Sequence, residues 1–178
     1  MAIELARRRF LLSALAVPIV SCRNTHQDLS AFTEEEPAHL LSAVQVGDPH
    51  SAPQLLSGWH RIEADAWRWT ARKFSVALRP PPGSPMLGAV LQFRFTLPEI
   101  VIRLLASVTL SASLPNLQLL SKTYDHIGDA LYAASIAPGV LVGDSVRVDF
   151  LLDKAILPSQ ADGRELGVIA HSVSLETK

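Results

Sequence analysis

The chain has 178 residues, and 48% of them are hydrophobic, which indicates a folded domain rather than a disordered chain. Its 16 basic and 17 acidic side chains give a net charge of −1, and this balance excludes the basic face that nucleic-acid-binding proteins use. Cys22 is the single cysteine, so an exported form of this chain must rely on apolar burial rather than on a disulfide.

The first segment, residues 1–21, is typical of a cleaved export signal. Arginines at positions 7–9 precede an apolar run over residues 10–20, which is too short to cross a bilayer because spanning takes about 20 apolar residues. Ile19-Val20-Ser21-Cys22 resembles the lipobox of bacterial lipoproteins, and the arginine run resembles a twin-arginine export signal. The resemblance implies that Cys22 is diacylated and holds the protein at the membrane of the bacterial cell envelope. An ordinary signal peptide with an unmodified cysteine is the alternative.

The next segment, residues 22–57, is predicted to be a flexible tether. It is polar and is interrupted by turn-forming residues, for example in Gly47-Asp48-Pro49-His50. Its only periodic part, residues 38–46, is predicted to form one or two turns of helix whose short apolar patch docks on the folded domain. The folded domain is then expected to span residues 58–178.

Beyond Gly58 the hydrophobic period is two, which is typical of half-buried β-strands. Long strands are predicted at residues 73–79, 87–97, 107–114 and 145–153, and a last strand at 165–175 changes phase before Val173. Shorter strands are expected at 117–120, 123–124 and 131–136, and a helical turn at 100–105. The side chains predicted to face the core are Phe74, Val76, Leu78, Ala89, Leu91, Phe93, Phe95, Leu97, Val108, Leu110, Ala112, Leu114, Val146, Val148, Phe150, Leu152, Leu166, Val168, Ala170, Val173 and Leu175.

These short strands are separated by Pro, Gly, Asn and Asp turns, and no long amphipathic helix interrupts them. The pattern predicts an all-β fold. We expect an antiparallel two-sheet β-sandwich of the jelly-roll or Greek-key kind, and a small closed barrel is the alternative.

The three tryptophans lie together in Gly58-Trp-His-Arg-Ile-Glu-Ala-Asp-Ala-Trp-Arg-Trp-Thr70, where Trp67 and Trp69 share one face of a strand. An indole face can stack on a sugar ring while neighbouring Arg, Glu and Asp bridge its hydroxyls, although tryptophan in a sandwich also packs in the core. We expect at least one tryptophan in the core and at least one at the functional surface. The candidate ligand-binding residues are Trp59, Glu63, Asp65, Trp67, Arg68, Trp69 and Arg164. Alternatively, Arg164 pairs with Glu63 and fixes the first and last strands together.

This segment, together with a later Val-x-Val-Asp-Phe-x-Leu-Asp-Lys and an Arg-Glu-Leu-Gly-Val, resembles a sandwich module of uncharacterised bacterial proteins, some of them linked to cell-surface polysaccharide genes. The resemblance covers residues 58–176 and implies a carbohydrate-binding-like fold without a transferable reaction. The matching residues are Gly58, Trp59, Glu63, Trp67, Arg68, Trp69, Thr70, Asp149, Phe150, Asp153, Lys154, Arg164, Glu165, Leu166 and Gly167.

No catalytic signature stands out in the sequence. It lacks a Gly-x-Ser-x-Gly elbow, and its histidines lack the spacing of zinc motifs. We therefore expect a non-catalytic, lipid-anchored envelope protein, without metal or cofactor, that binds a cell-surface polysaccharide or an envelope protein and no nucleic acid. A polysaccharide hydrolase, using acid pairs such as Glu63 with Asp65, and a structural subunit with a free sheet edge are the alternatives.

Overall fold

The computed structural model describes residues 39–159 and 162–178, so the predicted signal, Cys22 and most of the predicted tether lie outside the described residues. No helix in the described part is long and apolar enough to cross a bilayer. The helices are η2 (Pro49–Gln54, a 3-10 helix), α1 (Ser84–Leu87) and α2 (Glu99–Leu105). The strands are β1 (Ala43–Gln45), β2 (Leu55–Glu63), β3 (Trp67–Leu78), β4 (Ala89–Leu97), β5 (Val108–Leu114), β6 (Leu117–Gln118), β7 (Lys122–Tyr124), β8 (Gly128–Ile136), β9 (Val146–Leu152) and β10 (Ile169–Thr177).

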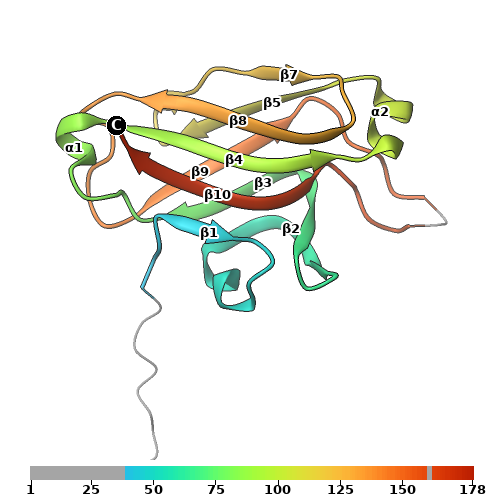
Figure 1. Ribbon diagram of the computed structural model, residues 1–178, viewed down its shortest axis with the longest axis horizontal. Coiled ribbons are helices and arrows are strands. Elements are labelled where there is room, and N and C mark those ends of the chain that lie inside the picture. Colours follow the sequence, from blue (N-terminus) through green and yellow to red (C-terminus); the bar gives the residue numbers. More distant parts are fainter. Residues whose placement is uncertain (1–38, 160–161) are drawn as a thin grey trace, which may run out of the picture. The chain divides into compact units, whose positions relative to one another are not determined.

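The ten strands form one antiparallel sheet that curls on itself, which confirms the all-β prediction. The hydrogen-bonded order is β6-β5-β9-β3-β10-β4-β8, and β1 pairs with β10, β2 with β3, and β7 with β5. In Figure 1, β8, β4 and β10 lie in front of β5, β9 and β3. The helical turn predicted at 100–105 is α2, and β8 starts earlier than predicted because residues 128–130 continue the ladder with β4.

Strand β3 is the place where the sheet divides. Strand β2 follows one edge of β3, whereas the other edge pairs first with β10, at Trp69 and Arg68, and then with β9 over residues 73–78. Beyond Ala170, β10 takes β1 as its neighbour instead of β3, and a β-bulge lies between Ala170 and Ser172. The bulge shifts the alternation of β10, so that the buried positions are Ala170 before it and Val173 and Leu175 after it, which confirms the predicted phase change.

The inner face of the curled sheet holds an aromatic cluster. The rings of Phe74 on β3, Phe93 on β4 and Phe150 on β9 have centroids 4.9–5.4 Å apart, and Tyr132 on β8 lies 6.5 Å from Phe150. These strands lie on both arms of the sheet, so the contacts cross the core. The predicted core is confirmed: its side chains are buried, except that Val146 and Leu166 are half-buried.

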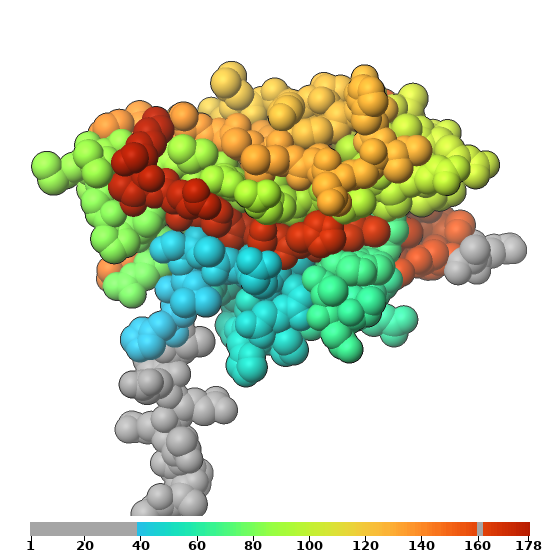
Figure 2. All heavy atoms as spheres, in the orientation of Figure 1, coloured from blue at the N-terminus to red at the C-terminus, as the bar shows by residue number. Residues whose placement is uncertain are grey.

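The tether prediction is wrong for the described residues up to 57, and so are the predicted helix at 38–46 and the domain start at Gly58. Residues 43–45 form β1, and Val44 and Val46 are fully buried. The physical reason is that β10 leaves β3 beyond Ala170, and its free backbone groups there need another strand. Figure 2 shows this segment, in blue and cyan, packed against the lower side of β10.

A buried glutamine closes the gap between β1 and β3. Gln54, the last residue of η2, is 5% exposed. Its Oε1 accepts a hydrogen bond from the Leu41 N–H at 3.0 Å, and its Nε2 donates to the carbonyls of Leu41 at 3.0 Å and Ala77 at 2.7 Å. The side-chain amide therefore replaces the strand pairing that is missing where the sheet divides.

Candidate functional site

The tryptophans pack against the core. Trp69 is 9% exposed, and Trp67 meets its ring edge-on at a centroid distance of 6.4 Å. Trp59 packs edge-on against Phe74 at 5.0 Å, and its Nε1 donates to the Ser75 carbonyl at 2.7 Å. The shared face of Trp67 and Trp69 and a core position for one tryptophan are confirmed. A sugar-stacking role for half-buried Trp59 or Trp67 stays a prediction.

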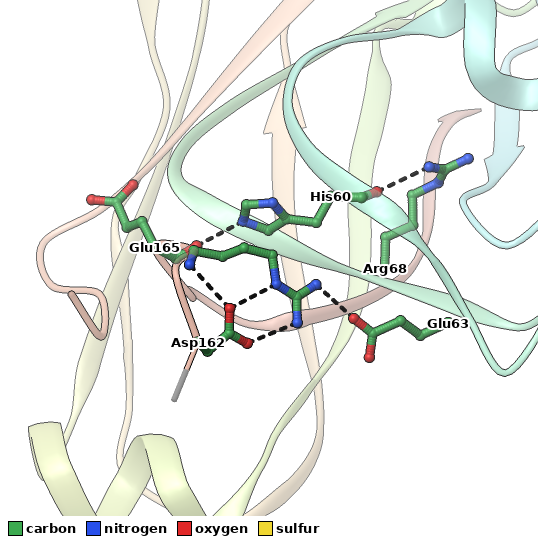
Figure 3. A network of polar contacts seen from close by, with 6 residues as sticks. His60, Glu63, Arg68, Asp162 and Glu165 are labelled. Carbon is green, nitrogen blue, oxygen red and sulfur yellow. Dashed lines mark hydrogen bonds and ion pairs between the residues drawn. The ribbon is translucent and has the colours of Figure 1, made fainter. Parts of the chain in front are cut away.

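The predicted ion pair between Arg164 and Glu63 is present (Figure 3). Nη1 of Arg164 lies 2.6 Å from Glu63 Oε1, while its Nε and Nη2 bind both carboxylate oxygens of Asp162 at 3.0 and 2.9 Å. The hydrogen bonds that Arg164 donates to the carboxylates of Asp162 and Glu63 raise the pKa of Arg164. The network fixes the loop before β10 to the end of β2, which is the stabilising role predicted from the sequence as the alternative for Arg164.

Arg68 also serves the backbone. Its Nε donates to the Val46 carbonyl at 2.7 Å and its Nη1 to the His60 carbonyl at 2.9 Å, so it joins β2 to the end of β1. Burial lowers the pKa of Arg68. His60 in turn bonds through Nε2 to the Glu165 carbonyl at 2.7 Å (Figure 3). Asp65 stands apart as an exposed residue of the β2–β3 turn, so the predicted ligand residues do not surround one open site.

The carboxylate of Asp162 makes the stability of this loop depend on pH. Hydrogen bonds from the side chain and backbone of Arg164 lower the pKa of Asp162 from 3.8 to about 2. A depressed folded-state pKa means that the stabilisation is present above pH 3.8 and is lost as the pH falls toward 2. We therefore expect the difference in free energy of unfolding between the wild type and Asp162→Asn to shrink from pH 5 to pH 2 in denaturant titrations.

Asp65→Asn is the matched control, because Asp65 is exposed and makes no ion pair within the described ranges. Its free energy of unfolding at pH 7 should stay within about 0.5 kcal/mol of the wild type. A difference between wild type and Asp162→Asn that stays constant over this pH range would contradict the role of the Arg164 pair.

A second group of polar side chains lies on the outer face of β2, β3, β9, β5 and β6. The strand register aligns five residues, one from each strand, and neighbouring strands lie about 4.8 Å apart, so the line extends about 19 Å. We call this line the polar row; its members are Ser57, Ser75, Asp149, Ser113 and Gln118.

Four members of the polar row line a hollow of about 360 Å³. The fifth, Ser75, is buried, and its hydroxyl lies 2.7 Å from that of Ser57 in a hydrogen bond. Lys73, Leu151 and Ser111 form the neighbouring row on one side, and Arg147 lies on the other side. Arg147 donates from Nε to Asp149 Oδ1 at 2.8 Å, and its Nη2 lies 2.7 Å from the same oxygen in an ion pair. The hydrogen bond to Asp149 raises the pKa of Arg147. The hollow thus combines hydroxyl, amide and charged groups on rigid strands with one exposed leucine.

Sequence reasoning missed the polar row because its members are far apart in the chain. Ser57 lies before the predicted domain start, and Ser113 and Asp149 are ordinary outward residues of alternating strands. The signal in the sequence that could have indicated the polar row was the series of small or charged residues at the outward positions of three predicted strands. The strand order was also needed to align them.

The opposite arm carries a hydroxyl beside an imidazole. Thr96 Oγ1 lies 2.8 Å from His171 Nε2 and donates to Asp129 Oδ1 at 2.5 Å. In a Ser-His-Asp triad the carboxylate binds the far nitrogen of the histidine, whereas this one binds the hydroxyl itself. The arrangement therefore lacks the orienting bond of a nucleophilic triad. No group of three metal-ligating side chains occurs in the described ranges.

No protein-family model matches this sequence. A search among curated proteins finds no match. The functional argument therefore rests on the geometry of the domain, and the resemblance to a polysaccharide-linked bacterial module stays a prediction.

Proposed function

We propose that this chain is a non-catalytic, lipid-anchored protein of the bacterial cell envelope whose domain binds a glycan along the polar row. The observation that carries the proposal is the alignment across five strands of five polar side chains, four of which line one hollow. Export and anchoring are supported by the apolar run of residues 10–20 and by Cys22 directly after it.

A glycan suits this hollow because sugars present many hydroxyl groups around weakly apolar ring faces. The serine hydroxyls, the Gln118 amide and the Arg147–Asp149 pair offer both donors and acceptors. Leu151, 39% exposed, supplies a small apolar surface between Lys73 and Ser111. Since the groups project from paired strands, little conformational entropy is lost when a ligand binds.

We also interpret the curled sheet as a two-sheet sandwich, with β5, β9 and β3 in one layer and β10, β4 and β8 in the other. The contact of Tyr132 with Phe150 supports this interpretation, because three strands separate β8 from β9 in the hydrogen-bonded order. In this interpretation, the polar row lies on the outer face of the layer that contains β5, β9 and β3, and this face of the sheet binds the ligand.

A substitution that fills the hollow tests the proposed function. We expect Ser113→Tyr to weaken polysaccharide binding at least tenfold, because the ring would occupy the polar row between Asp149 and Gln118, while the melting temperature stays within a few degrees. Affinity gel electrophoresis against a panel of bacterial surface polysaccharides gives the measurement.

Ser135→Tyr is the matched control, since Ser135 is an exposed outward residue of β8 on the other arm. It should bind as the wild type does. Retention of the Ser113→Tyr variant equal to that of the wild type, or no retention of the wild type by any polysaccharide, would exclude glycan binding along the polar row.

A further inference from the structure

We infer that the glycan bound along the polar row is anionic, an inference that rests on the proposed function. The charged side chains of the hollow are Lys73, Arg147 and Asp149. Two of the three are cations, so the hollow has a net charge of +1 while the whole chain has −1. The positive charge is therefore local to this surface.

The acidic residue of the hollow is already engaged. Asp149 Oδ1 accepts a hydrogen bond from Arg147 Nε at 2.8 Å and forms an ion pair with its Nη2 at 2.7 Å, which makes the pair nearly neutral toward a ligand. Lys73 remains, exposed on β3 opposite Leu151, and its ammonium makes no ion pair with any residue of the described chain. An acidic group on the ligand would give the Lys73 ammonium an ion-pair partner. Such a group is favoured over a hydroxyl because a charge-assisted hydrogen bond is about twice as strong as a neutral one.

A further cation extends the same surface. Arg79 follows β3 six positions after Lys73, on the same alternating face and about 20 Å away at the rise of a strand. Asp144 lines the neighbouring hollow with Arg79 and, among the described residues, forms no ion pair with it. The cations along this face suit a polymer with repeated acidic groups better than a single sugar acid.

A glycan fits the hollow better than a nucleic acid does. Proteins that bind single strands stack the bases on exposed aromatic rings. The one aromatic ring pair that borders the hollow, Phe74 and Phe150, is buried beneath the sheet surface at 1% exposure each. Hydroxyl and amide groups line the surface instead.

The test compares polymers that differ only in charge. Polygalacturonate and its methyl ester form a carboxylate pair, and dextran sulfate and dextran form a sulfate pair. We expect the mature protein to bind at least one acidic polymer about tenfold or more tightly than its neutral counterpart, with an affinity that falls as salt rises. Lys73→Gln should remove most of this preference.

Lys178→Gln makes the same charge change outside the hollow and should keep the preference. If charged and neutral polymers bind equally and Lys73→Gln has no effect, the inference of an anionic glycan is wrong, whereas the proposal that the polar row binds a glycan still holds. Binding of none of the four polymers would overturn both. Tighter binding of a single-stranded oligothymidylate than of either acidic glycan would also overturn the inference and indicate a nucleic-acid partner.

Discussion

A chain that starts at Leu55 is expected to lose cooperative unfolding, whereas a chain that starts at His39 keeps it. The shorter chain lacks β1 and η2, and with them the buried side chains of Val44 and Val46. Burial of these two side chains contributes about 1.5–3 kcal/mol each. The outer part of β10 also loses its hydrogen-bonded neighbour. Together these losses approach the typical domain stability of about 5–15 kcal/mol. Thermal unfolding followed by circular dichroism measures the difference.

A point substitution isolates the contribution of Gln54. Gln54→Leu leaves the Leu41 N–H and the carbonyls of Leu41 and Ala77 without their partner, and should lower the free energy of unfolding by about 2–4 kcal/mol. Gln45→Leu is the matched control, because Gln45 is an exposed residue of β1, and should change the free energy of unfolding by less than about 0.5 kcal/mol.

The truncation experiment has an outcome that contradicts its prediction. If the chain that starts at Leu55 melts cooperatively, within a few degrees of the chain that starts at His39, then residues 39–54 are a flexible tether as first predicted.

Cys22→Ala is expected to move the protein from the membrane fraction to the soluble exported fraction. A diacylglyceryl group carries two acyl chains, and each buried methylene contributes about 0.8 kcal/mol to membrane binding, so its loss removes nearly all of the attachment. Fractionation of expressing cells and metabolic labelling with a fatty acid give the measurement. Cys22→Ser is a second variant that also removes the thiol and should behave in the same way.

A control keeps the anchoring test independent of the fold. Ser21→Ala changes the residue before the cysteine to another small residue and should leave the protein attached. A Cys22→Ala protein that stays in the membrane fraction after a high-salt wash would exclude lipid anchoring. The folded domain and the proposed glycan site would be unaffected by that result, since the first strand of the sheet begins at Ala43.

Period-two patterns predicted most of the sheet because its long strands bury one face and expose the other. In β4, for example, Leu91 and Phe93 are fully buried while Gln92 between them is half-buried. The same reasoning failed at β1, which has three residues and too short a pattern to exclude a helix. Its strand conformation is set by β10, more than 120 positions later in the chain.

The candidate site was less predictable for a related reason. Residue types such as tryptophan and arginine attract attention, but Trp69 is buried and Arg68 binds two backbone carbonyls. The polar row depends on which strands are neighbours, and Ser57 and Asp149 come into line only through β3 and β9. Period alone shows that Asp149 faces outward. It does not show what lies beside it.

The central place of β10 has a consequence for how the protein is made. This strand lies between β4 on one side and β3 and β1 on the other, so each arm of the sheet depends on it. The two arms of the sheet cannot be joined before β10 has been synthesised. Because such distant pairing is slow to form, the fold is completed late. Chaperones therefore meet a chain whose sheet is not yet closed.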